Sequence, residues 1–216
     1  MQSNADIDEE DFNESMELNS RHITHEQFKK FEGYMSEIFS ALGMDVNTPS
    51  TLETPKRFVR AMFDITDGYE GDEKLLKVFG TEYRADSSRC LSQVIEGPIH
   101  FYALCEHHAL PFYGDAYVGY IADQKIIGLS KLTRLVRLFG KRFTVQERME
   151  EQIADTLQSM LQPHGVAVYL QAHHLCSEMR GVREHSPLTR TMTWRGEYID
   201  NPALRAEFYS AAGLQR

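Results

Sequence analysis

The sequence predicts an α+β fold whose sheet is largely antiparallel. Two helical patterns come first, then a run of strands, then two more helices and further strands. This order differs from the regular alternation of strand and helix that builds a doubly wound parallel sheet. The 216 residues include 42% hydrophobic residues and no internal repeat, so the chain can bury a real core. We therefore expect one domain with an appendage.

Residues 1–22 are expected to be a disordered tail. Between Ala5 and Glu17 the chain carries several acids and no base. Such a run of like charges with few apolar residues cannot bury enough surface to fold by itself. A role in docking or autoinhibition is the alternative to a solvated extension.

Residues 23–80 are expected to form a helical segment. Thr24 and Gln27 have the spacing of a capping box, and apolar residues then recur at helical spacing until Gly43. A second helix is predicted from residue 56 to about residue 66, because Pro55 is favoured in the first turn of a helix. These helices are expected to provide packing or contacts between subunits.

Residues 81–216 are expected to form the main domain of the chain. Signals between Gly80 and Gly97 are weak and favour a strand, a turn and another strand, and further strands are predicted at residues 113–121, 125–129 and 166–172. One helix is predicted to start near Ser130, with Ser130 as its N-cap. Another is predicted over residues 144–161, where Glu147 occupies the capping-box position.

Composition and charge limit the classes of function. The formal net charge of −9 argues against a nucleic-acid binder, although a local basic cluster can still hold a small anion. Three cysteines, no signal peptide and no long apolar run favour a cytoplasmic protein without a membrane partner. Cys90 lies apart from the other two cysteines and is expected to be an incidental thiol.

The densest chemistry lies in residues 104–112, a short turn flanked by apolar residues. Cys105 and His108 are three residues apart, a spacing that lets a thiolate and an imidazole converge on one small cation. His107 is their neighbour in the chain and is expected to point elsewhere. A catalytic zinc takes three protein ligands and keeps a fourth position for water, so one more Cys or His is needed.

A second cluster follows the strand predicted at residues 166–172. Side chains alternate along a strand, so His174, Cys176, Glu178 and Arg180 would share one face if the extended backbone continues that far. Cys176 is our candidate for the third metal ligand. The interpretation then leaves two imidazoles, those of residues 107 and 174, for proton transfer. A closed structural site with two cysteines and two histidines, or no metal at all, is the alternative.

Basic residues stand near the starts of two predicted helices. Lys131 and Arg134 lie in the first turn of one helix, and Lys56, Arg57 and Arg60 lie early in the other. The dipole of a helix favours acids at its amino end, so bases there indicate an anionic ligand such as phosphate. The alternative is a basic face turned toward water or toward a partner subunit.

With these features in view, the chain resembles the GTP cyclohydrolase I family over roughly residues 24–210. The resemblance rests on several motifs that occur in the right order: residues 104–108 (Leu-Cys-Glu-His-His), 127–132 (Ile-Gly-Leu-Ser-Lys-Leu), 145–148 (Val-Gln-Glu-Arg), 174–176 (His-Leu-Cys) and 180–182 (Arg-Gly-Val). It implies the tunnelling fold, in which an antiparallel sheet with helices packed on one side joins copies of itself into a ring. It also implies a homo-oligomer, usually a decamer, with active sites between subunits.

The resemblance implies an enzyme that converts GTP and water to 7,8-dihydroneopterin triphosphate and formate with the cofactor Zn²⁺. The implied zinc ligands are Cys105, His108 and Cys176. The implied catalytic residues are His107, His174 and Ser130. The implied substrate-binding residues are Gln146 and Glu147 at the guanine, and Lys131, Arg134, Arg180, Arg57 and Arg60 at the triphosphate, the last two from a neighbouring subunit.

The chain departs from the family pattern at a few positions. Ser177 and Glu178 stand where apolar residues are common, and Glu178 is expected to pair with Arg180 and so to weaken phosphate binding. Two competing interpretations are an enzyme of the same fold that acts on a pterin or deazapurine precursor, and a ring protein whose zinc is structural. The phosphate-binding bases and Glu147 argue against the first, and the spare histidines argue against the second.

Overall fold

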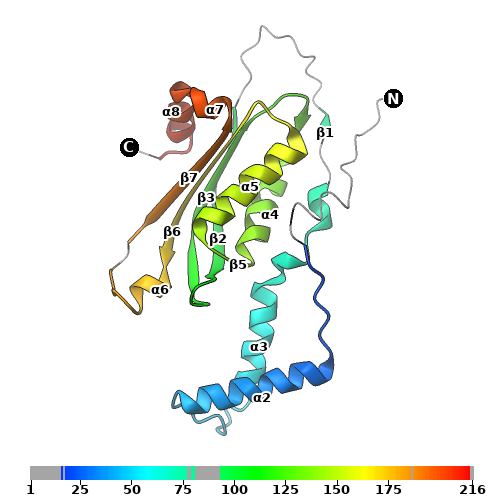
Figure 1. The fold of residues 1–216 in the computed structure, drawn as a ribbon, viewed down its shortest axis with the longest axis vertical. Coiled ribbons are helices and arrows are strands. Elements are labelled where there is room, and N and C mark those ends of the chain that lie inside the picture. Colours follow the sequence, from blue (N-terminus) through cyan, green and yellow to red (C-terminus); the bar gives the residue numbers. More distant parts are fainter. Residues whose placement is uncertain (1–15, 17, 77–78, 81–92, 186, 215–216) are drawn as a thin grey trace.

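The computed structural model describes residues 16, 18–76, 79–80, 93–185 and 187–214. Its centre is a curled sheet covered on one face by helices α4 (Leu129–Gly140) and α5 (Gln146–Leu161), as Figure 1 shows. Helices α2 (His25–Ala41) and α3 (Thr54–Ile65) lie below the sheet in this view. The α+β prediction is confirmed.

The main sheet has five strands in the order β5-β2-β3-β6-β7. The long strands β2 (Gln93–Cys105), β3 (Pro111–Ile121), β6 (Gly165–His174) and β7 (Thr189–Gly196) pair antiparallel with their neighbours, whereas the short β5 (Phe143–Thr144) pairs parallel with β2. The sheet is therefore mixed, and the expected antiparallel character holds for the long strands. A separate two-stranded sheet joins β1 (Phe79–Gly80) to β4 (Lys125–Ile126).

The main core forms between this sheet and helices α4 and α5. Helix α4 buries an apolar stripe, and alternate residues of β2, β3 and β6 meet it. Full burial of such a side chain contributes roughly 1.5–3 kcal/mol, so this layer dominates the stability of the domain. The buried residues of the stripe are Leu132, Leu135, Val136 and Phe139.

The opposite face of the sheet is covered at one end only. Helices α7 (Glu197–Asp200) and α8 (Pro202–Ala211) pack there through Tyr198 and Phe208, which contact the ring of Trp194. This differs from the expectation of helices on one side. The reason is that Tyr117 and Tyr169 stand on this face and need apolar cover, whereas the other end of the face is polar and open.

The two N-terminal helices form as predicted. Thr24 and Gln27 make both hydrogen bonds of the capping box, from the Gln27 N–H to Thr24 Oγ1 at 3.1 Å and from the Thr24 N–H to Gln27 Oε1 at 2.9 Å. Helix α2 has no buried residue among those described. After α3, Gly68 connects the segment to the sheet domain, because its carbonyl oxygen accepts two hydrogen bonds from the guanidinium of Arg142.

The prediction of a disordered tail falls mostly on residues 1–15 and 17, which lie outside the described residues. The end of that segment packs against the body of the molecule. Met16 is fully buried and its sulfur accepts a hydrogen bond from Thr156, while the backbone N–H of Asn19 donates to the Tyr69 carbonyl at 2.6 Å. Arg21 forms an ion pair with Glu70.

Three local predictions are wrong. The N-cap of α4 is Gly128, so Ser130 lies inside the first turn, and the N-cap of α5 is Val145, so Glu147 does not complete a capping box. The extended backbone of β6 ends at His174, where the short helix α6 (Leu175–Glu178) begins. In the part of the chain that the structure describes, no helix is long and apolar enough to span a membrane.

Candidate metal centre and active site

The hairpin between β2 and β3 presents two of the predicted metal ligands. Cys105 is the last residue of β2, and its backbone N–H donates to the carbonyl of Leu110, which closes the turn. The N–H groups of His108 and Ala109 both donate to the Cys105 carbonyl, at 3.3 and 2.8 Å. Ala109 takes a left-handed conformation, with φ of 53°, to complete the turn. The turn therefore brings the side chains of Cys105 and His108 to one side.

Helix α6 brings the third ligand. The ligand atoms of Cys105, His108 and Cys176 lie within 4.8 Å of one another, and they are the one such group among the described residues. Two thiols and an imidazole are donors that zinc prefers, and three protein ligands match a catalytic site with one position left. Burial and the adjacent Cys105 both raise the pKa of the Cys176 thiol. A divalent cation would offset this penalty, so the residues fit zinc.

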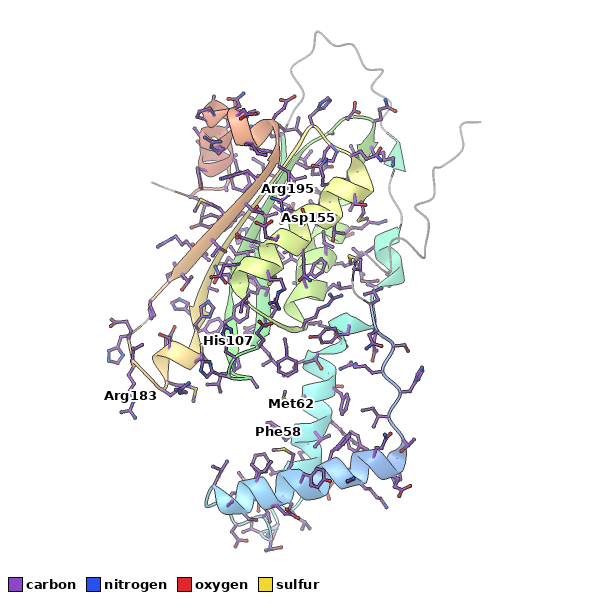
Figure 2. All side chains as sticks on the ribbon, viewed as in Figure 1. Phe58, Met62, His107, Asp155, Arg183 and Arg195 are labelled. Carbon is purple, nitrogen blue, oxygen red and sulfur yellow. The ribbon has the colours of Figure 1, made fainter. Side chains whose placement is uncertain are left out.

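His107 lies beside the metal ligands without joining their group. It is exposed, its Nδ1 atom is 3.9 Å from the sulfur of Cys105, and its ring is nearly perpendicular to that of His108, at 79°. Figure 2 shows His107 at the lower end of the sheet, below Asp155 and Arg195 on α5 and β7. An exposed imidazole so close to the ligands can exchange a proton with a bound substrate.

His174 is the second spare imidazole, and it is held rigidly. Its ring stacks on Phe112 with the ring centroids 4.8 Å apart and the planes 2° from parallel. Its Nε2 atom lies 2.9 Å from Oε1 of Gln146, the first residue of α5. Burial lowers the pKa of His174, against the opposing effect of the nearby Glu147 and Glu178 carboxylates. The neutral imidazole is therefore favoured near pH 7.

Gln146 was predicted to lie at the guanine, but the structure commits its side chain to the protein. Gln146 is only 1% exposed. Its Nε2 atom donates to the carbonyls of Leu170 and Thr189 and to Thr191 Oγ1, at 3.2, 3.2 and 3.1 Å. The next residue, Glu147, is exposed and remains available to a ligand.

Glu106 connects the metal turn to the start of α5. Both of its carboxylate oxygens bind the guanidinium of Arg148, one of them at 3.0 Å, and this pair lowers the pKa of Glu106. A bidentate pair has a fixed geometry, so it restrains the turn relative to α5. Glu178, in turn, contacts Nδ1 of His173 at 3.2 Å. Among the described residues no ion pair joins Glu178 to Arg180, so that prediction is wrong.

The bases predicted at the triphosphate do not all lie near the metal ligands of the same chain. Arg180 is exposed and close enough to Cys176 to favour its thiolate. Ser130, Lys131 and Arg134 begin α4, which follows the far end of β3. Ser130 and Arg134 line a hollow together with Asp72 and Lys141, and none of the three metal ligands lines it. One chain therefore does not bring both sets of residues to one site.

The sequence analysis did not identify three residues that lie beside the predicted site residues. Asp72 binds Arg134 at 2.9 Å and lines a hollow of about 680 Å³ beside Ser130 and α4. Thr191 and Glu150 lie behind Gln146. Glu150 could have been identified from the sequence, as an acid within the apolar stripe of α5. The contacts of Asp72 and Thr191 could not, because they join residues that are far apart in the sequence.

The buried Glu150 is expected to make stability depend on pH. Burial and the neighbouring Glu151 and Glu147 raise its pKa from 4.5 to about 7, despite a hydrogen bond from Thr191 and the charge of Arg195. The folded chain thus holds the proton more tightly than the unfolded chain. The stabilisation is complete below about pH 4.5 and is lost as the pH rises to about 7.

Glu150→Gln should therefore raise the melting temperature relative to the wild type above pH 7 but not near pH 4.5. The full shift of the Glu150 pKa would correspond to roughly 3 kcal/mol in the free energy of unfolding. We expect about half of that, because solvent screens part of the effect. Thermal unfolding of both proteins at equal concentration across this range measures the effect. A difference in melting temperature that does not change with pH would contradict the assignment.

Comparison with known proteins identifies the same family as the sequence motifs. The family model described as GTP cyclohydrolase I matches residues 31–213. GTP cyclohydrolase 1 of Campylobacter concisus is 39% identical over 188 residues, covering 87% of this chain and 97% of that protein. The Deinococcus radiodurans protein of that name is 42% identical over 176 residues, covering 81% and 79%. The solved archaeosine synthase QueF-Like in the apo form aligns with 50% of the chain at 13% identity and a TM-score of 0.38, too weak to bear on the argument. By its sequence, this chain belongs to the GTP cyclohydrolase I family.

Proposed function

We propose that the protein is a zinc-dependent GTP cyclohydrolase I. It opens the imidazole ring of GTP, releases formate and rearranges the remainder to 7,8-dihydroneopterin triphosphate, the first step of pterin and tetrahydrofolate biosynthesis. The observation that carries the proposal is the convergence of Cys105, His108 and Cys176 beside the imidazoles of His107 and His174, in a chain of this family. A purely structural zinc site would have no use for the two further histidines.

The residues around the metal have separate roles in the reaction. When bound, zinc supplies Lewis-acid activation of water near neutral pH. His107, exposed beside the ligands, protonates the imidazole nitrogen of guanine as that ring opens. His174 serves the acid–base steps at the ribose, for which an imidazole is suited near pH 7. Glu147 accepts hydrogen bonds from the guanine N–H groups.

The complete site requires more than one copy of the chain. Ser130 and Arg134 line a hollow that none of the metal ligands lines, so a neighbouring copy would place them, with Lys131, at the ribose and triphosphate. Arg57 and Arg60 on α3 are exposed and would come from a further copy. These bases, with Arg180, explain how a chain of net charge −9 can hold a triphosphate.

Exposed apolar residues on α2 and α3 support a homo-oligomer. Tyr34, Ile38 and Leu42 on or beside α2, and Phe58 on α3, are all at least 39% exposed. Large apolar side chains that gather on one helical pair are typical of a surface that another subunit covers. We propose a ring-forming assembly, a decamer as implied by the family, in the cytoplasm.

Asp72 is expected to compete with the triphosphate for Arg134. Burial raises the pKa of Asp72, but hydrogen bonds from Arg134 and from the Lys74 backbone outweigh it and keep the carboxylate charged. The Asp72–Arg134 pair is partly exposed and so contributes at most about 1 kcal/mol, which corresponds to roughly fivefold in affinity. Asp72→Asn should therefore lower KM for GTP by up to about fivefold and leave kcat unchanged. Steady-state kinetics would contradict this competition if KM rose.

Incubation of the purified protein with GTP tests the proposed function. We expect formate and, after oxidation, the fluorescence of the pterin product, both in proportion to the zinc content of the sample. Chelation should remove both signals and added zinc should restore them. A zinc-loaded protein that leaves GTP intact would overturn the proposal in favour of a structural metal site or a related enzyme.

A further inference from the structure

The side chain of Gln146 has only one chemically consistent orientation. One end of the amide faces two backbone carbonyls, of Leu170 and Thr189, each at 3.2 Å. Carbonyl oxygens only accept hydrogen bonds, so this end must be the NH₂ group. The other end, which faces His174 at 2.9 Å, must then be the amide oxygen.

Thr191 supports the same orientation. Its Oγ1 atom lies 3.1 Å from Nε2 of Gln146, and a hydroxyl oxygen can accept a hydrogen bond from the amide. Three acceptors on two strands therefore hold the NH₂ group in place.

The orientation of Gln146 decides which nitrogen of His174 carries hydrogen. The amide oxygen is an acceptor only, so the hydrogen bond at 2.9 Å requires a hydrogen on Nε2 of His174. In the neutral imidazole the lone pair is then on Nδ1. The stack on Phe112, with planes 2° from parallel, fixes the plane of the ring.

We propose that Gln146 is a positioning residue, which holds His174 by its Nε2–H group and leaves the lone pair of Nδ1 available to the substrate. This inference rests on the proposed function for the identity of the substrate, but not for the state of the ring. It gives Gln146 a role other than direct contact with guanine. Thr191 then serves to hold the amide in the orientation that His174 needs.

Neutron diffraction from deuterated crystals of the unliganded protein tests the state of the ring directly. Crystals at about pH 8.5 lie two units above the ordinary histidine pKa of about 6.5, so the ring is neutral. We expect deuterium on Nε2 of His174 and none on Nδ1. Deuterium on Nδ1 alone would overturn the inference whatever the protein does with GTP.

Kinetics of Gln146→Met test whether the hydrogen bond matters for turnover. Methionine has a similar length but offers no amide oxygen, and loss of a partner that orients an imidazole costs roughly 10- to 100-fold. We expect kcat to fall by that factor, with KM for GTP within about threefold of the wild type and the His174 ring in altered orientations. A rise in KM at unchanged kcat would instead assign Gln146 to substrate binding and refute the proposal.

Gln158→Met is the matched control, because it makes the same chemical change on α5 at a half-buried residue remote from the site. Any loss of melting temperature common to both variants reports on packing, and only Gln146→Met should lose turnover. Equal losses of kcat in the two variants would contradict a positioning role. If the wild type does not turn over GTP, the proposed function fails, while the neutron result still decides the state of His174.

Discussion

Replacing Cys176 with alanine is expected to abolish metal binding and turnover together. Cys176 is one of three ligands whose donor atoms lie within 4.8 Å of one another, and two remaining ligands hold zinc poorly. Because the metal activates water for the reaction, activity should fall on the order of 10³-fold or more. Zinc content of the purified variant and formate release from GTP measure the two effects on one sample.

Ser177→Ala is the control for Cys176→Ala. Ser177 is the next residue of α6 and is not among the metal ligands, so the change tests whether the short helix tolerates substitution. It should keep its zinc. A Cys176→Ala protein that lacks metal yet releases formate at the wild-type rate would show that the ligand assignment is wrong. Loss of zinc in both variants would mean that α6 itself is disrupted.

The second large effect is expected at His107, where alanine should leave zinc in place and remove turnover. His107 stands outside the ligand group, with its Nδ1 atom 3.9 Å from the Cys105 sulfur. General acid–base groups contribute roughly 10²- to 10⁴-fold, so we expect kcat to fall by a factor in that range. KM for GTP should change little, because the side chain acts in the reaction and not in binding.

His108→Ala is the matched variant, since it removes the neighbouring imidazole from the same turn. It should lose zinc as well as activity, because His108 belongs to the ligand group. Metal analysis of both proteins decides between the two histidines. Retained zinc in His108→Ala together with lost zinc in His107→Ala would exchange their assignments.

Local patterns in the sequence predicted the features that depend on near neighbours. The capping box of Thr24 and Gln27 forms as expected, because its contacts span only three residues. The convergence of Cys105 and His108 also follows from one turn of the chain. The motif resemblance to the family is confirmed by the comparisons.

The tertiary structure alone decided how these pieces meet. Gln146 lies 28 residues from His174 and 45 from Thr191, and Asp72 lies 62 residues from Arg134, so no local periodicity encodes these pairs. Ser130 is not an N-cap because Gly128 already takes the extended conformation before α4.

The sequence by itself thus determined the family, the metal ligands as candidates and the chemistry that they offer. The fold decided that Gln146 is buried behind His174 and that Arg134 lines a hollow that the metal ligands do not line. The physical reason is that pairing between strands and helices distant in sequence is set by the whole core. A local pattern specifies only the face that each element buries.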